Sequence, residues 1–421
     1  MYCGTRIRYA RPNSTVASAS PAIQPSERLV ALDVLRGLAL LGMFFVHFND
    51  NSIEPSGGPG LAYRRFVELF FQTQFWTMFA ILFGAGFGVQ LRRAGSDERS
   101  FILRYGRRLA ALAVFGAVAE IFFGYWVLLG YAIWGIPLLL VRRWSNRALV
   151  IALVVCASSI PLYSVTRAVY FQAIGKPELD AVWRRAANEQ DATALNEFQA
   201  TQRASDYRTA VSGRLRYMPH KYSQRVFILP TNEFTLFLIG FLALRLGLFD
   251  QPQRHTRLIV SVVIFGVLSW ATSHWLLPFT ITSTPPTWLP LRVATLTAGN
   301  AFRLIRDSWL ALTYIGAILL LVSRPGWQRG LSVFSITGRM ALTNYMLQVV
   351  ILDLTFSNYA FGAQISAWLS PVAALALFGA ELAFGRWWLS RFSYGPLEWL
   401  WRSATYARWE QIRHLPAPKA A

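Results

Sequence analysis

A histidine, two amides and a carboxylate lie together at the end of the first long apolar segment of the chain. His47 is followed by Asn49, Asp50 and Asn51. Imidazole is the side chain best suited to moving protons near neutral pH, and amide groups beside it can stabilise an oxyanion. The alternative is a structural histidine bonded to a loop carbonyl. We take His47 as the candidate general base and Asn49 as its catalytic neighbour.

A carboxylate and a guanidinium stand earlier in the same segment. Asp33 and Arg36 are three residues apart, so they share one face of a helix, and His47 follows eleven residues after Arg36. An ionisable residue at membrane depth is costly unless it is paired or faces a cavity. The spacing therefore predicts either an ion pair that anchors the start of the helix or a group that holds an anionic ligand.

Further polar residues interrupt other apolar segments. Any one of them is most simply explained by a hydrogen bond between helices, but together they predict a polar cavity. Arg339, Thr343 and Asn344 recur at spacings of four and five, and thus share roughly one helical face with Gln348. The candidate residues lining the path of a substrate or acyl donor are Asp33, Arg36, Gln74, Glu120, Glu233, Arg339, Thr343, Asn344 and Gln348.

The segments that must position these residues are long and apolar. The 421 residues are 54% hydrophobic and only 15% charged, against about 25% charged in an ordinary soluble domain, and the mean hydropathy is +0.36. Apolar runs of about 20 residues match the hydrocarbon thickness of a bilayer. The sequence predicts an all-α, polytopic integral membrane protein with about ten transmembrane helices, near residues 29–48, 66–89, 109–123, 126–141, 148–170, 227–248, 258–277, 309–322, 340–355 and 365–389.

The net charge of +20 is explained by membrane topology. Arginines fall in short clusters between the apolar runs, as in 92–108, which excludes a nucleic-acid binder and predicts cytoplasmic loops. The protein is then a multi-pass protein of the cytoplasmic (inner) membrane, and both of its termini lie on the cytoplasmic side. The predicted parts are a disordered leader (1–28), an N-terminal bundle of about five spans (29–170), an extracytoplasmic helical insertion (171–225), a C-terminal transmembrane domain (226–405) and a basic tail (406–421).

Motifs of soluble enzymes are absent from the sequence. It contains no Walker loop, no G-x-S-x-G, no H-E-x-x-H and no Cys/His set with zinc spacing, so we expect no metal and no tightly bound cofactor. Gly84, Gly86 and Gly88 lie inside an apolar run, where small residues let helices approach closely. Two cysteines cannot form a disulfide framework.

Four stretches carry a resemblance to a known family. RLVALDVLRGLALLG (28–42) resembles the opening D-x-x-R-G helix of the YeiB-like membrane proteins, the family named domain of unknown function 418. FWTMFAILFGAG (75–86) looks like the second-span signature of that family. GRMALTNYMLQ (338–348) and YGPLEWLWR (394–402) resemble its C-terminal domain.

The family's opening helix is in turn similar to that of transmembrane acyltransferases such as the heparan glucosaminide acetyltransferases. This resemblance implies transfer of an acyl group from cytoplasmic acyl-CoA, as co-substrate, to an extracytoplasmic or membrane-embedded hydroxyl or amine on a glycan or lipid-linked acceptor. Arg36 and the row around Arg339 would then shape the donor path, and His47 would be the base on the acceptor side. A transporter or permease, or a non-catalytic envelope component, is the alternative function.

Overall fold

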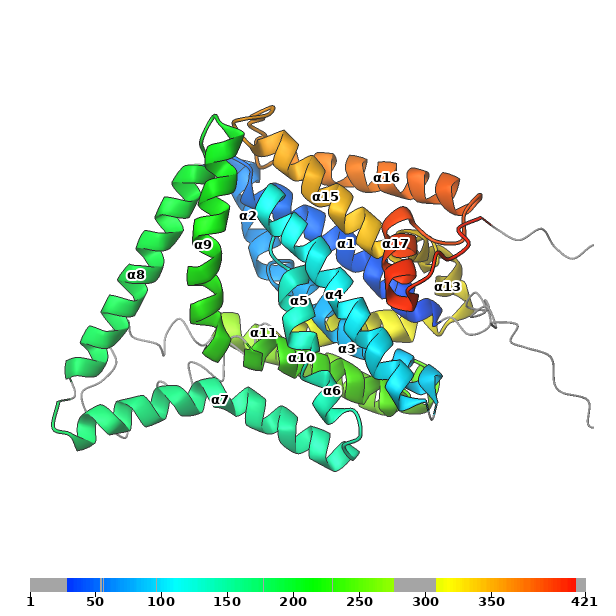
Figure 1. Cartoon of the computed structure of the whole chain (residues 1–421), viewed down its shortest axis with the longest axis horizontal. Coiled ribbons are helices and arrows are strands. Elements are labelled where there is room, and N and C mark those ends of the chain that lie inside the picture. The colour runs from blue at the N-terminus through cyan, green and yellow to red at the C-terminus, as the bar shows by residue number, and fades with distance from the viewer. Residues whose placement is uncertain are drawn as a thin grey trace, which may run out of the picture.

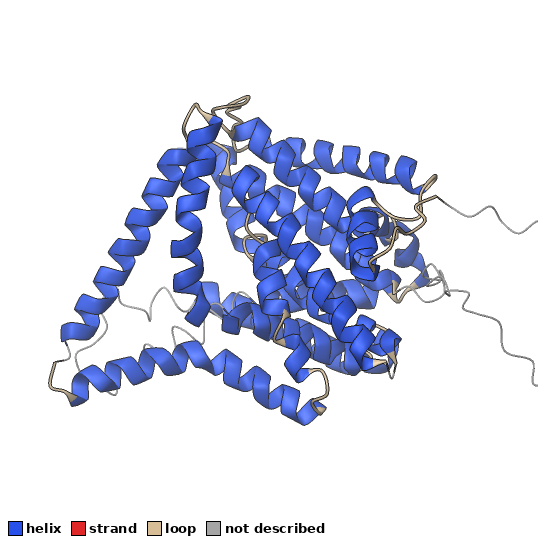
Figure 2. Ribbon diagram, in the orientation of Figure 1, coloured by secondary structure: helices blue, strands red, loops and turns tan. Residues whose placement is uncertain are grey.

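The computed structural model describes residues 29–53, 55, 57–95, 97–176, 178–228, 230–275 and 308–413. Within these ranges every regular element is a helix, which confirms the predicted all-α class (Figure 2). The predicted leader and the last eight residues of the predicted tail lie outside them.

The helices follow one another closely along the chain (Figure 1). They are α1 (Val30–Asp50), α2 (Gly58–Phe70), α3 (Gln74–Ala94), α4 (Glu98–Phe123), α5 (Leu128–Gly135), α6 (Leu138–Val141), α7 (Asn146–Ala173), α8 (Glu178–Gln202), α9 (Tyr207–Ile228), α10 (Pro230–Arg245), the 3-10 helix η2 (Pro252–His255), α11 (Thr256–Trp275), a helix Ser308–Val322, α13 (Pro325–Leu331), α14 (Phe334–Arg339), α15 (Ala341–Phe356), α16 (Ser370–Leu389) and α17 (Pro396–Tyr406).

Four of the described helical stretches are long and apolar enough to cross a membrane. They are Val30–Asp50, Gly58–Ala94, Pro252–Thr272 and Ser370–Leu389, and a fifth arises if Ser308–Val322 and Pro325–Leu331, bent by 116°, form one broken span. Length and composition of the described helices therefore do not establish the ten predicted transmembrane helices. The other predicted spans coincide with shorter helices such as α15, or with helices whose ends carry charges such as α4. These apolar helices are compatible with a membrane protein.

Glycines allow several pairs of the described helices to touch, among them α1 with α14. In α1, a Cβ at Gly37 would lie 1.9 Å from the carbonyl oxygen of Phe334 in α14. On the other side of the same contact, a Cβ at Gly338 would lie 1.8 Å from the carbonyl oxygen of Asp33. Only glycine permits this approach of two backbones, so the two glycines fix α14 against the first half of α1.

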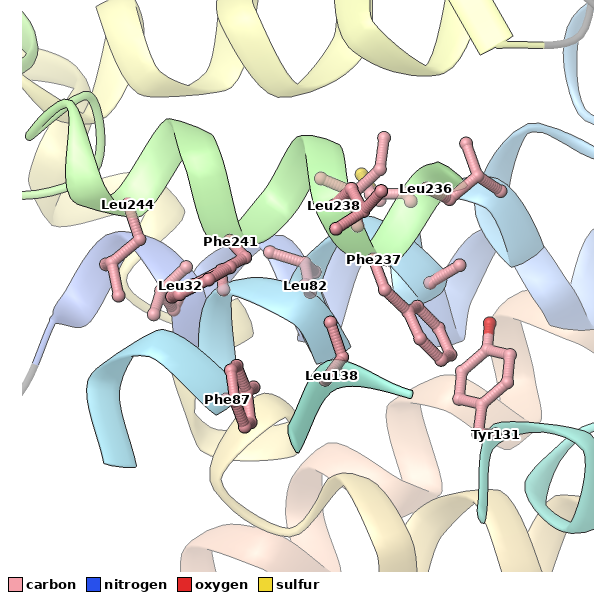
Figure 3. Packing of buried hydrophobic residues seen from close by; sticks show 14 of the residues in the cluster. Leu32, Leu82, Phe87, Tyr131, Leu138, Leu236, Phe237, Leu238, Phe241 and Leu244 are labelled. Carbon is pink, nitrogen blue, oxygen red and sulfur yellow. The ribbon is translucent and has the colours of Figure 1, made fainter. Parts of the chain in front are cut away.

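Helices α3 and α10 pack just as closely. A Cβ at Gly84 would lie 1.9 Å from the carbonyl oxygen of Phe237, and one at Gly240 would lie 1.8 Å from that of Ile81. Phe237 and its neighbours on α10 fill the surrounding core together with Leu82 and Phe87 of α3 (Figure 3). The glycine-rich stretch of α3 thus has the packing role expected from its sequence.

Helices α7, α8 and α9 extend from one side of the bundle and form an open triangle (Figure 1). The predicted insertion, 171–225, corresponds to the end of α7, all of α8 and most of α9. Both flanking helices run past its predicted limits, α7 to Ala173 and α9 to Ile228.

Candidate functional site

An elongated cavity of about 660 Å³ lies between α1, α3, α4, α5, α15 and α17. Trp76 and Ala94 of α3 both line it, and at about 1.5 Å per residue they are about 27 Å apart along the helix. Its volume is in the range of about 300–1,000 Å³ that is usual for small-molecule sites. A site of this shape suits a long, thin ligand.

One end of the cavity is strongly cationic. This end lies where α1 begins, α3 ends and α4 begins. Six arginines and two carboxylates line the cavity, which leaves a formal excess of four positive charges that attracts anions. They are Arg36, Arg93, Arg104, Arg108, Arg339 and Arg402, with Asp33 and Glu398.

The opposite end of the cavity is apolar and aromatic. Its walls come from the middle of α1, the start of α3, the start of α5 and the first turns of α15. The cavity therefore combines an anion-attracting cationic end with an apolar end. The lining residues at this end include Met43, Trp76, Phe79, Leu128, Tyr131 and Tyr345.

Asp33 and Arg36 form the ion pair that their spacing predicts. Arg36 Nη1 lies 3.1 Å from Asp33 Oδ1, and both side chains line the cavity. Opposite them is Gly86 of α3, where a Cβ would be 3.5 Å from Arg36 Nη2. The predicted ion pair near the start of α1 is confirmed, and a role of Arg36 in holding an anionic ligand stays a prediction.

The other arginines differ in how they are held. The guanidinium of Arg108 lies 3.7 Å from the ring centroid of Trp401. Arg402 Nε lies 3.0 Å from Glu410 Oε2. Arg104 is half-buried, and within the described ranges its side chain has no hydrogen bond or ion pair. Arg104 is therefore the arginine of this end that is most available to an incoming anion.

The predicted polar row does not lie on one helix, because Arg339 ends α14 and the chain leaves helical geometry at Met340 before α15 begins. The members of the row on α15 are largely occupied by structural contacts. Glu398 of α17 accepts hydrogen bonds from the backbone amides of Leu342 (2.6 Å) and Thr343 (3.0 Å) and from the Thr343 hydroxyl (2.6 Å). A carboxylate in this position caps the N-terminus of α15. Burial raises the pKa of Glu398, while these hydrogen bonds oppose the rise. Asn344 Nδ2 donates to the carbonyl of Thr337 at 3.1 Å.

Four more predicted residues lie outside the cavity lining. Gln348 Nε2 donates to Glu381 at 3.1 Å, and Gln74 Nε2 donates to the Gln72 carbonyl at 3.1 Å. Glu233 lies against Gly130, where a Cβ would be 3.3 Å from Glu233 Oε2.

The fourth of these residues, Glu120, belongs to the attachment of α9. Lys221 Nζ lies 2.6 Å from Glu120 Oε1, and the Tyr222 hydroxyl donates to Glu120 Oε2 at 2.7 Å. A second buried ion pair joins Arg214 of α9 to Asp353 of α15 at 2.9 Å. The Lys221–Glu120 and Arg214–Asp353 ion pairs connect α9 of the insertion to α4 and α15.

His47 lies just beyond the apolar end of the cavity. Its ring meets the edge of Tyr125, with centroids 5.1 Å apart, and its imidazole has no hydrogen bond within the part of the chain that is described. Arg36, Met43 and His47 follow at spacings of seven and four, so they lie on one stripe of α1. Met43 lines the cavity and His47, one turn further along, does not. Asn49 is buried, and its Oδ1 has no partner among the described residues.

Of the residues predicted from the sequence, the cavity brings together Asp33, Arg36 and Arg339. Sequence reasoning missed the arginines that complete its entrance, because they were interpreted only as topology signals. Helical phase could have placed two of them on one face of a helix, but not shown that this face meets a cavity. Arg104 and Arg108 share a face of α4 with the buried Leu112, whereas Arg107 is exposed. No three His, Cys, Asp or Glu side chains of the described ranges come together as a metal site requires.

Fold and site together define an all-helical protein with membrane-compatible apolar helices and an amphipathic internal cavity. Residues 241–408 match the family model "Protein of unknown function (DUF418)". The chain is similar to "Uncharacterized protein YxaH" of Bacillus subtilis (28% identity; 93% of this chain and 98% of the relative) and to "Uncharacterized protein YeiB" of Escherichia coli (25%; 90% and 96%). The DUF418 match thus covers the C-terminal part of the chain, and the similarity to YxaH and YeiB extends over nearly all of it. No solved structure gives a significant match.

Proposed function

We propose that this protein is a multi-pass transmembrane acyltransferase of the cytoplasmic membrane, with about ten helices and both termini in the cytoplasm. It moves an acyl group from cytoplasmic acyl-CoA to a hydroxyl or amine of an extracytoplasmic or membrane-embedded acceptor, such as a glycan or a lipid-linked molecule. The observation that carries the proposal is the elongated cavity with arginines at one end and apolar side chains at the other.

The polarity of the cavity agrees with the proposed topology. Its arginine-lined end lies beside the loop that joins α3 to α4, within the arginine cluster 92–108. Lys and Arg are retained on the cytoplasmic side of membrane proteins, so this end would open to the cytoplasm. Acyl-CoA carries several phosphate charges on a long, flexible, largely uncharged arm. Arginine pairs well with phosphate, and the apolar end would receive the acyl group.

The reacting groups would meet at the apolar end. The acceptor oxygen or nitrogen attacks the thioester carbon, His47 takes the proton of the acceptor, and the thiolate of CoA leaves. His47 is one helical turn, about 6 Å, beyond Met43. In this proposal the acceptor reaches His47 from the opposite side to the donor, and the Met43 level is where the two substrates meet.

The test measures release of free thiol by purified protein in lipid nanodiscs, with acyl-CoA of increasing chain length and hydroxyl or amine acceptors. Arg104→Gln removes one cation from the entrance, and Arg107→Gln is the matched control on the exposed face of α4. A hydrogen bond to a charged group contributes about 1.5–3 kcal/mol, so KM for acyl-CoA should rise about 10- to 100-fold in the first variant only. Equal KM values in the two variants would contradict donor binding in this cavity.

The alternative, a transporter, is favoured by one feature. The helix Ser308–Val322 and α13 are bent by 116° at a short break, and broken helices of this kind line transport paths. A wild-type protein that cleaves no thioester but carries a labelled anion into proteoliposomes, with loss of uptake in Arg104→Gln, would support transport instead.

A further inference from the structure

A buried hydroxyl without a partner lies at the apolar end of the cavity. Tyr345 is 4% exposed and lines the cavity, and its hydroxyl has no hydrogen-bond partner among the described residues. Other tyrosines of the same cavity are satisfied: Tyr131 donates to the carbonyl of Trp76 at 3.0 Å, and Tyr105 donates to that of Gly135 at 3.3 Å. Leaving a buried hydroxyl unpaired costs free energy, so a ligand that accepts a hydrogen bond from it would remove that cost.

The start of α5 brings positive potential to the end of the cavity where the Tyr345 hydroxyl lies. Val127 and Leu128, at the start of α5, line the same cavity as Tyr345. The first N–H groups of a helix have no partner within the helix, and they form the positive end of its dipole. Tyr345, Val127 and Leu128 all pack in the hydrophobic cluster that contains Met43. The site is therefore dry, and electrostatic interactions there are strong.

We propose that Tyr345 is a catalytic residue whose hydroxyl stabilises the oxyanion formed during acyl transfer. This inference rests on the proposed function and names a residue that it did not use. Attack by the acceptor forms a bond to the thioester carbon and sends the carbonyl electron pair to oxygen, where Tyr345 donates its hydrogen bond. When the carbonyl re-forms, the carbon–sulfur bond breaks. The CoA thiolate leaves and takes the proton that His47 received from the acceptor.

The position of Tyr345 between the residues that the proposal assigns to the donor and to the acceptor supports this role. Met43, which shares its cluster, is one turn from His47 on the same stripe of α1. Arg339, six residues before Tyr345, lines the cationic part of the same cavity. One short stretch of chain thus supplies a group for the anionic part of the donor and a group for its reacting carbonyl.

The experiment compares Tyr345→Phe with Tyr314→Phe, a tyrosine of the helix Ser308–Val322 outside the cavity lining, in the thiol-release assay, together with the melting temperature of each variant. Tyr345→Phe removes a hydroxyl with no partner, so its melting temperature should be equal to or above that of the wild type. Its kcat should fall about 10²- to 10³-fold with KM for acyl-CoA nearly unchanged, as for loss of one oxyanion donor. Tyr314→Phe breaks the hydrogen bond to the Phe70 carbonyl, so it should lower the melting temperature and leave kcat within a few-fold.

Each other result has a definite meaning. A Tyr345→Phe protein with wild-type kcat overturns the oxyanion role and leaves the acyltransferase proposal standing, since turnover is still observed. A parallel loss of kcat and melting temperature shows a structural role and also overturns it. If wild-type protein releases no thiol with any donor and acceptor, the proposed function fails and the role of Tyr345 fails with it.

Discussion

The ion pair between Arg214 and Asp353 should hold α9 on the bundle. Arg214 Nη2 lies 2.9 Å from Asp353 Oδ1, and the two side chains are only 2% and 3% exposed. Arg214 also contacts the Phe122 carbonyl and donates to Gln202 Oε1 at 2.7 Å. Removing one member of a buried pair leaves the other charge without its partner, which costs about 3–5 kcal/mol. Arg214→Met should therefore weaken the docking of α9 by about this amount.

The measurement is hydrogen exchange along α8 and α9 in nanodiscs. Every 1.4 kcal/mol is about a tenfold change in an equilibrium, so a loss of 3 kcal/mol should raise local opening by about two orders of magnitude. Arg92→Met is the matched control, because Arg92 and Asp250 form an exposed pair at 2.6 Å whose loss should cost at most about 1 kcal/mol. Arg214→Met combined with Asp353→Leu should recover part of the lost protection, since no buried charge remains.

One result would refute this reasoning. If exchange in α9 is the same in Arg214→Met and Arg92→Met, the pair does not carry the docking, and the hydrophobic contacts of α9 must do so. If the double variant is as open as either single variant, the effect arises from lost packing rather than from an isolated charge.

Three further predictions follow from the site. His47→Ala should lower thiol release about 10²- to 10⁴-fold with normal abundance in the membrane, and full activity in His47→Asn would show that this histidine does not transfer protons. Asp33→Asn and Arg36→Met should each reduce abundance more than the double variant does, as judged by immunoblot, because each single change isolates a charge near the start of α1. Labelled cysteines in 178–202 should react from outside intact cells and those in 324–339 only after permeabilisation; the reverse pattern would overturn the proposed topology.

Local spacing allowed part of the structure to be predicted. The pairing of Asp33 with Arg36 is a property of one helical turn, so the sequence alone identifies it. A packing role for Gly84 and Gly88 likewise follows from the sequence, although their partner helix, α10, does not. The all-helical class follows from composition. The number of helices that cross the membrane does not, because breaks such as the one between α2 and α3 at 71–73 interrupt an apolar run without a strong sequence signal.

Contacts between distant segments could not be predicted. Glu398 caps α15 from a helix more than 50 residues further along the chain, and Arg214 meets Asp353 across a still longer separation. An arginine at the end of an apolar run looks the same in the sequence whether it faces the cytoplasm or a cavity. Arg104 and Arg107 differ only in helical phase, and that phase gains meaning only when the neighbouring helices are known.

The segments that carry the family resemblance meet at this cavity. Gly37 and Gly338 bring α1 and α14 into backbone contact. Arg36 directly precedes Gly37 and Arg339 directly follows Gly338, so the contact places both arginines in one cavity wall. Glu398 then fixes the start of the helix that carries Tyr345. A fold that needed these glycines only for packing would not need an arginine beside each of them. The combination is explained if the motifs encode an anion-binding entrance joined to a reaction site, which is the arrangement that an acyl-CoA donor requires.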